Sequence, residues 1–407
     1  CTYIYSIPFP DIYEDESRSY EMVVDLKTFE SFKYDFIIWR LVGVFPSERY
    51  RWLYYLYSVF INGLVSIYYP LSLIINVFVV DTIKVLLENL TLNITVVVCT
   101  MKAFNIFFKK KQLVKVKEYT TALDARATNP DEQKLLRGVV KRCRQYFLFY
   151  STLYGIVFIT GEISVLFAKE KRLMYPAWFP IDWRASDTNY LIIHFYQLIG
   201  ISIQIIQNLA DDTYPTFYIF VLCGHVKALC MRVKRLGSDP KKTEDEHFDE
   251  LVACINDHKM ILEYCNVVQN VLSFVMLLQF FSSEIILCLT AVYALYIQDN
   301  YLEIIYICTY FAAVFMEINL CCYYGNELMT TSDELTTALY SCNWIDRNQK
   351  FKKVLIIFMS KTQKKCRINE NTKTISNNCV MQNFFQIMKT TYSLYAVLHQ
   401  MKSNNRF

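Results

Sequence analysis

Long apolar stretches alternate with shorter, charged stretches along the chain. A membrane-spanning helix needs about 20 mostly apolar residues, and six stretches clearly meet this requirement. They occupy residues 52–80, 84–108, 145–168, 190–224, 264–297 and 301–324. A seventh, weaker stretch at residues 380–401 is aromatic and carries few charges. The pattern predicts an all-α membrane protein with seven transmembrane helices.

Basic residues are distributed unevenly among the predicted connections. Of the chain's 42 Lys and Arg, 34 lie in four alternate segments, at residues 1–51, 102–144, 225–261 and 324–380. The connections on the other side hold four, all within residues 168–189. Because cytoplasmic loops carry the excess of Lys and Arg, we expect a cytoplasmic N-terminus and, after seven crossings, an extracellular C-terminus. This topology is inverted relative to that of a G-protein-coupled receptor.

Some of the predicted helices are longer than a bilayer requires. At about 1.5 Å per residue, residues 264–297 span on the order of 50 Å, against a hydrocarbon core of about 30 Å. The fourth stretch, with its continuation to residue 237, is similarly long. Residues 334–365 read as a further helix, with Trp344 and Leu355 among its regularly spaced apolar side chains. We therefore expect an intracellular helical anchor layer, built from the ends of helices four to six and this segment, as a place where subunits meet.

Composition agrees with a chain that is largely surrounded by lipid. Hydrophobic residues make up 54%, charged residues make up 20%, and the mean hydropathy is positive. The five histidines have no nucleophile or carboxylate partner at the spacing of a catalytic motif, and there is no CxxC pair. We expect no enzymatic activity, no metal or cofactor, and no nucleic-acid partner.

Polar residues in the last apolar stretch fall on one helical face, at Asn383, Gln386, Thr390, Ser393 and Gln400. The position that completes this series is Val397, and Met401 follows one turn later. A polar stripe interrupted by an apolar ring is typical of a conduction path with a hydrophobic gate, if several copies surround an axis. The same stripe is also compatible with packing against polar groups of its own subunit.

Aromatic residues and a few polar groups recur in the halves of the helices that we expect to be external. This mixture suits a pocket for a small apolar ligand, although aromatic residues at helical spacing also arise from plain packing. The candidate ligand contacts are Asn93, Tyr154, Phe158, Gln197, Ile201, Tyr306 and Tyr310.

Acidic residues within the apolar stretches admit two interpretations. They are Glu162, Asp211, Asp212, Glu284 and Glu317. Intramembrane acids can form an ion or proton path, which would make the chain a transporter. For Asp211 and Asp212, polar contacts between helices are the favoured interpretation.

Short motifs near the end of the chain are shared with a known family. They are Tyr324-Gly325-Asn326-Glu327, Ala338-Leu339-Tyr340 with Trp344, and Tyr392-Ser393 leading to Val397-Leu398. In combination they resemble the insect odorant receptor family. Weaker similarities occur at residues 39–46, 175–183 and 225–237.

The resemblance implies an inverted seven-helix subunit of a tetrameric, odorant-gated, nonselective cation channel. Its ligand would be a small, volatile, hydrophobic odorant, and its location the plasma membrane of an olfactory neuron dendrite. The implied pore and gate positions are Ser393, Val397, Gln400 and Met401. The implied subunit-anchor positions are Tyr340, Trp344 and Leu355.

The link between helices four and five distinguishes two kinds of subunit in this family. The obligate co-receptor carries a long cytoplasmic insertion there, whereas this chain has only a short link around residues 237–248. The resemblance therefore implies a ligand-tuning subunit that assembles with the co-receptor in the lipid bilayer.

These expectations divide the chain into four regions. They are a cytoplasmic N-terminal segment (1–51), transmembrane helices one to six with the ligand pocket (52–324), a cytoplasmic anchor helix and loop (325–379), and a pore-lining seventh helix with a short extracellular tail (380–407). The alternative functions are a G-protein-coupled chemoreceptor and, less favoured, a transporter.

Overall fold

The computed structural model describes residues 26–45, 51–80, 82–167, 171–295 and 301–362, together with Lys389, Thr390, Ser393, Ala396 and Gln400. All regular secondary structure in these residues is helical. The shorter helices at the start of the chain are η2 (Thr28–Phe32), α1 (Lys33–Leu41), α2 (Arg51–Asn62), the π-helical η3 (Gly63–Tyr68) and α3 (Tyr69–Val77). The remaining helices are α4 (Ile83–Arg126), α5 (Pro130–Leu166), α6 (Asp187–Lys234), α7 (Glu244–Ala294), α8 (Tyr301–Tyr340) and α9 (Gln349–Thr362).

Six helical segments in the described part of the chain are long and apolar enough to cross a membrane. The first runs from Trp52 to Val77 and the others are α4 to α8. The sequence-based prediction of these six crossings is therefore confirmed in number and order. The predicted seventh stretch, residues 380–401, lies mostly outside the described residues.

The predicted excess length of the fourth and fifth helices is confirmed, since α6 has 48 residues and α7 has 51. The expectation that residues 102–144 form a connection was wrong, because only residues 127–129 there lie outside helices. Asn129 caps the N-terminus of α5, because its side-chain oxygen accepts a hydrogen bond from the Asp131 N–H at 2.8 Å. Pro130 occupies the first turn of that helix. As a result α4 and α5 also extend well beyond the length of a bilayer.

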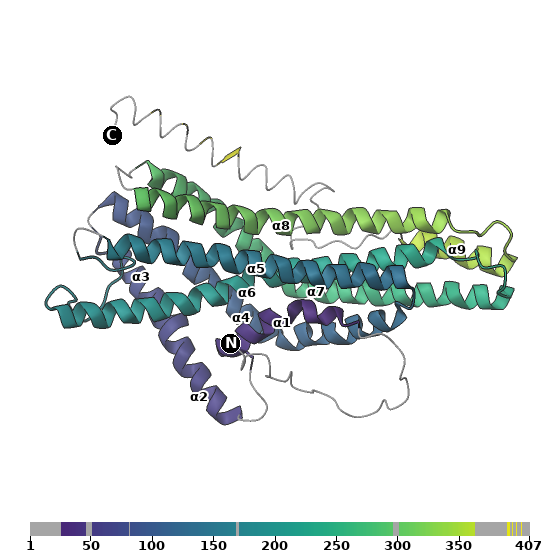
Figure 1. The fold of residues 1–407 in the computed structure, drawn as a ribbon, viewed down its shortest axis with the longest axis horizontal. Coiled ribbons are helices and arrows are strands. Elements are labelled where there is room, and N and C mark those ends of the chain that lie inside the picture. Colours follow the sequence, from purple (N-terminus) through teal and green to yellow (C-terminus); the bar gives the residue numbers. More distant parts are fainter. Residues whose placement is uncertain are drawn as a thin grey trace.

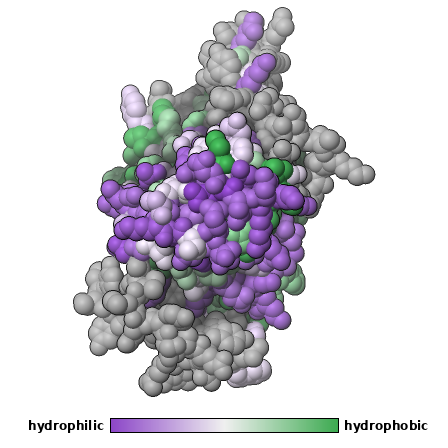
Figure 2. Space-filling model, turned by 90° about the vertical axis from the view of Figure 1, so that its right-hand side faces the viewer, coloured by the Kyte–Doolittle hydropathy of each residue, from purple (hydrophilic) through white to green (hydrophobic). Residues whose placement is uncertain are grey.

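The long helices lie side by side and give the molecule an elongated shape (Figure 1). In this view α3 lies near one end of the bundle and α9 lies at the opposite end. Figure 2 looks onto the α9 end, where hydrophilic residues dominate the described surface. Long apolar helices with a hydrophilic end fit a bundle that crosses a bilayer and continues into water.

Ion pairs hold the helices together near the α9 end. Glu132 at the start of α5 is 1% exposed and pairs with Arg232, at 2.7 Å, and with Arg235. Arg232 also pairs with Asp257 of α7, which lies 3.1 Å from the Nε of Arg126 in α4. One network thus connects α4, α5, α6 and α7 beyond the apolar part of the bundle.

Residues 26–45 lie against the middle of the bundle. The Thr28 N–H donates to Asp124 of α4 at 2.8 Å, and the Trp39 Nε1–H donates to Asp211 of α6 at 2.8 Å. Trp39 is fully buried and belongs to the largest hydrophobic core. The segment before the first crossing is therefore part of the fold.

The predicted helix over residues 334–365 is interrupted. Helix α8 ends at Tyr340 and α9 begins only at Gln349. Glu244 at the start of α7 accepts hydrogen bonds from the Asn348 N–H at 2.9 Å and from Arg347 at 2.8 Å, and the Asn348 side chain caps α9. Contacts with a distant helix thus favour a turn that the local apolar spacing does not reveal.

The turn after α6 depends on a glycine. Gly237 has φ +73°, and a Cβ built there would lie 2.2 Å from the carbonyl oxygen of Asn343. We expect Gly237→Ala to lower the free energy of unfolding by about 1–3 kcal/mol from the backbone conformation alone, and by more because of the clash. Thermal unfolding of detergent-solubilised protein measures this change. Gly138→Ala is the control, since Gly138 lies in α5 with open space around its Cβ; equal losses in both variants would contradict the prediction.

Candidate ligand-binding site

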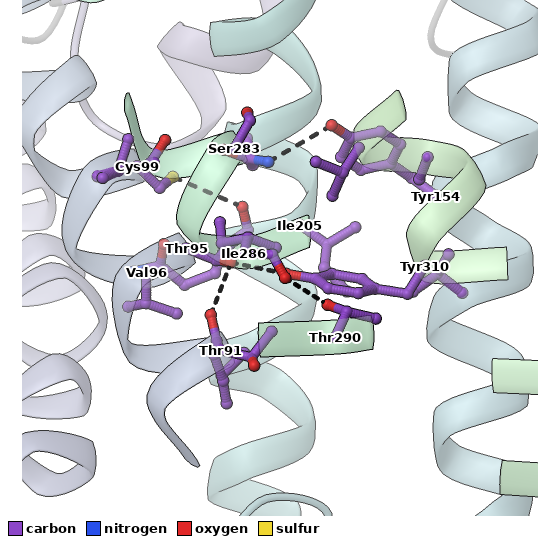
Figure 3. Close-up of a pocket in the computed structure, with 18 of the residues that line it drawn as sticks. Thr91, Thr95, Val96, Cys99, Tyr154, Ile205, Ser283, Ile286, Thr290 and Tyr310 are labelled. Atoms are coloured by element: carbon purple, nitrogen blue, oxygen red, sulfur yellow. Dashed lines mark hydrogen bonds between the residues drawn. The ribbon is translucent and has the colours of Figure 1, made fainter. Parts of the chain in front are cut away.

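A cavity of about 110 Å³ lies among α4, α5, α6, α7 and α8. Figure 3 shows Tyr154 and Tyr310 projecting from one side of it toward Thr95 and Ser283. The volume of this cavity is smaller than that of the cavity of roughly 150 Å³ that holds benzene, so a bound organic molecule of that size or larger has to widen the space. Its apolar wall includes Leu92, Val96, Ile201, Ile205, Ile286 and Ile307.

The end of the cavity nearer to α3 is lined by aromatic residues, and we call it the outer end. The hydroxyl groups of Tyr310 and Thr95 lie 2.8 Å apart, and the rings of Tyr310 and Tyr306 are stacked with centroids 6.2 Å apart. Tyr175, from the loop before α6, reaches the same end. Burial raises the pKa of Tyr175 to about 12, so its phenol is neutral at physiological pH.

The loop that carries Tyr175 is fixed to the helices by side-chain amides. The Asn89 amide donates to the carbonyl of Pro176 at 2.6 Å, and the Gln197 amide donates to the carbonyl of Tyr175 at 2.9 Å. Trp178 N–H donates to the Ser72 carbonyl at 3.0 Å. These contacts make the loop an ordered cap over the outer end of the cavity.

The opposite end of the cavity is polar, and we call it the deep end. Lys102 of α4 is 2% exposed, pairs closely with Asp212 of α6 and lies 3.5 Å from the Oε1 of Glu317 in α8. The Tyr154 hydroxyl of α5 donates to Asp212 at 2.6 Å, and the Asn208 amide lies 3.4 Å from the same hydroxyl. Four helices therefore meet around one buried ammonium group.

Of the predicted ligand contacts, four line this cavity and three do not. Tyr154, Ile201, Tyr306 and Tyr310 line it. The Asn93 amide is buried and donates to the Leu73 carbonyl at 3.0 Å, Gln197 holds the loop, and Phe158 packs against the core next to that loop. Periodicity could not separate these roles, because a polar residue that braces two helices has the same spacing as one that faces a cavity. Ligand contact by any of these residues stays a prediction.

Several polar cavity residues were not among the predicted contacts, although the sequence offers a signal for them. Lys102, Gln279 and Ser283 line the cavity, and each is a polar residue inside an apolar stretch. Lys102 was counted with the basic loops because it stands at the edge of its stretch. The favoured interpretation of Asp211 and Asp212 as polar helix contacts agrees with their bonds to Trp39, Lys102 and Tyr154.

Two of the predicted pore positions belong to the described residues. Ser393 and Gln400 are helical and exposed. Val397 and Met401 lie outside the described residues. Among the predicted anchor positions, Tyr340 is 71% exposed, Trp344 is half-buried, and Leu355 is buried in the core of its own chain.

Comparison with known proteins gives consistent matches over most of the chain. The family model described as 7tm Odorant receptor matches residues 82–392. Odorant receptor 2a of Drosophila melanogaster is 32% identical over an alignment of 392 positions that covers 93% of this chain and 98% of that protein. Odorant receptor 59a of the same species is 29% identical and covers 93% of this chain and 99% of that protein.

Solved structures share the fold. The insect olfactory receptor OR5 from Machilis hrabei in complex with eugenol aligns with a TM-score of 0.77 at 15% identity, over 92% of this chain and 98% of that one. A second structure of the same receptor aligns with a TM-score of 0.75 at 15% identity, over 91% of this chain and 97% of that one. The arrangement of the helices is thus one that solved receptors adopt.

Proposed function

This chain belongs to the odorant receptor family, and on that premise we propose that it is the ligand-tuning subunit of an odorant-gated, nonselective cation channel formed with the family's co-receptor. The observation that supports this proposal most directly is the cavity among α4 to α8, with its apolar wall and polar deep end. Such a cavity suits a small, volatile, hydrophobic odorant.

Gating by a ligand requires that the ligand bind the open state more tightly than the closed state. The cavity is lined by α7 and α8, which continue from it to the α9 end. If a bound odorant changes the spacing of these helices, the change would therefore be transmitted to the α9 end, which lies farthest from the loop of Tyr175. We propose that this motion separates the pore helices at Ser393, Val397, Gln400 and Met401.

The proposed assembly is a heterotetramer in the plasma membrane of an olfactory neuron dendrite, with the α9 end in the cytoplasm. The hydrophilic surface of that end and the basic segments around it support this orientation. The side chains of Tyr340 and Trp344 are exposed or partly exposed at the α9 end, and the Trp344 Nε1–H donates to the Tyr340 carbonyl at 3.1 Å. We propose that both contact a neighbouring subunit, and that buried Leu355 acts by holding α9 in place.

Electrical recording tests the channel proposal. Cells that express this chain with the co-receptor are expected to give odorant-evoked cation currents that persist in excised patches without nucleotide. Cells with the co-receptor alone provide the control for currents that do not need this chain. Currents that vanish without nucleotide would point instead to a G-protein-coupled receptor.

Filling the cavity tests whether odorants act there. Ile205 lines the cavity, whereas the next residue, Ile206, is 43% exposed on the outer surface of α6. We expect Ile205→Trp to raise the half-maximal odorant concentration at least about tenfold, because the loss of about 1.4 kcal/mol of binding energy has that effect. Ile206→Trp should leave the dose response unchanged at equal surface expression. An unchanged response in Ile205→Trp would place odorant binding elsewhere.

A further inference from the structure

The deep end of the cavity holds hydrogen-bond acceptors that the described residues leave unused. Gln204, Gln279 and Glu317 all line the cavity. The Oε1 atoms of Gln204 and Gln279 are buried and accept no hydrogen bond from the described residues, and the buried Oε1 of Glu317 lies no closer than 3.5 Å to the Lys102 ammonium that it shares with Asp212. Gln204 is 3% exposed and Glu317 is 8% exposed. A buried acceptor without a donor is costly, so each of these oxygens favours a ligand that supplies one.

The assignment of the acceptor is firm for two of these side chains. The Gln204 Nε2 donates to the Val65 carbonyl at 2.9 Å; because a carbonyl can only accept, the Oε1 must be the atom left over. Glu317 is a carboxyl group, and its Oε1 shares Lys102 with Asp212. One ammonium thus serves two carboxyl groups.

Each donor group with a fixed geometry at the deep end already has at least one acceptor. Lys102 is held by Asp212 and Glu317, the Tyr154 hydroxyl donates to Asp212, and the Asn208 amide is directed at that hydroxyl. The Ser283 hydroxyl lies 2.9 Å from the Gln279 amide and can accept as well as donate. The buried polar atoms of the cavity lining that lack a close partner are therefore acceptors.

The two ends of the cavity differ in chemistry along one direction. Glu317 lies ten residues after Ile307 on α8, a separation of about 15 Å along the helix. Near Ile307, the outer end presents the rings of Tyr306 and Tyr310 together with Leu92, and Glu88 is the acidic residue at this end. A ligand with one polar group is oriented by this difference, with its apolar body among the outer aromatic rings.

We propose that the receptor is tuned to amphipathic ligands whose polar group donates a hydrogen bond, namely small alcohols, phenols or amines, rather than to ketones, ethers or esters of the same size. The O–H or N–H group binds among Gln204, Gln279 and Glu317. This inference rests on the proposed function, since it assigns a ligand class to the same cavity.

Matched pairs of volatiles measure the preference directly. The probes are 2-heptanol against 2-heptanone, 4-methylphenol against anisole, and hexylamine against methyl pentyl ether, applied to cells that express the chain with the co-receptor. We expect the donor of each pair to act at about a tenfold lower concentration, as one well-placed hydrogen bond to a buried acceptor provides. Currents evoked equally or better by the ketone and the ethers would overturn the ligand class and leave the channel proposal standing. No current above that of the co-receptor alone from any probe would overturn both.

Glu317→Gln tests the place at which the preference arises. The amide brings an N–H into the deep end, so the donor preference should shrink at least about threefold or reverse. Glu334→Gln is the matched control, because Glu334 is exposed on the same helix. Should Glu317→Gln fail to reach the cell surface, Gln279→Met removes a second acceptor and should also reduce the preference. A full donor preference in the variant that reaches the surface would overturn the assignment to these residues.

Discussion

Replacement of Lys102 with methionine is expected to lower the free energy of unfolding by about 3–5 kcal/mol, the usual result of breaking a buried ion pair by removing one partner. The loss arises because Asp212 and Glu317, which are 9% and 8% exposed, would keep their carboxyl groups without the ammonium between them. Thermal unfolding in detergent and the fraction of receptor at the cell surface measure the effect.

Two further variants make the Lys102 prediction specific. Lys109→Met is the control, since Lys109 lies two turns further along α4 and is only half-buried. Lys102→Met combined with Asp212→Asn and Glu317→Gln should recover part of the lost stability, because no buried charge then lacks a partner. A single Lys102→Met variant as stable as the unmodified protein would show that the ion pairs contribute little to the fold.

Trp39→Ala is expected to have the second large effect. Trp39 is fully buried, and its ring lies 5.1 Å from Tyr214 and 5.7 Å from Phe45, centroid to centroid. Loss of such a side chain costs about 3–5 kcal/mol, and Asp211 loses the hydrogen bond from the indole N–H as well. The free energy of unfolding should fall by at least that amount, measured in detergent.

Two comparisons separate packing from hydrogen bonding at Trp39. Trp39→Phe keeps most of the packing and removes the N–H, so the remaining loss should be about 1–3 kcal/mol, the cost of leaving a buried acceptor without its donor. Trp52→Ala removes the same side chain where it is 73% exposed, and should change stability little. If Trp52→Ala proved as costly as Trp39→Ala, the N-terminal segment would not be the stabilising element described above.

The membrane crossings could be predicted from the sequence because each spanning helix must be long and apolar enough by itself, whatever its neighbours are. A helix in a bilayer needs only its own length and apolar composition, so residues 301–324 were recognisable without knowledge of any neighbour. The turn at 341–348 could not be predicted in this way, since it depends on Glu244, more than 100 residues earlier. Interruption of that helix is a tertiary effect.

The sequence predicted a pocket among the helices, but it predicted only some of the residues that line the cavity. Aromatic residues at Tyr306 and Tyr310 were expected to face a ligand, and both line the cavity. Lys102 looks from its position like one more basic residue at the end of an apolar stretch. Its role emerges only when α6 and α8 bring Asp212 and Glu317 to it, 110 and 215 residues further along the chain. Such pairings are invisible to any local pattern.

The unbroken length of α7 has a mechanical consequence. With 51 residues, this helix is about 76 Å long and acts as a stiff lever arm. A tilt of one degree about its midpoint displaces each tip by roughly 0.7 Å. If the proposed function holds, a ligand that pushes on the α7 residues of the cavity would tilt the whole helix, and the opposite tip would move without local unfolding of the backbone in between.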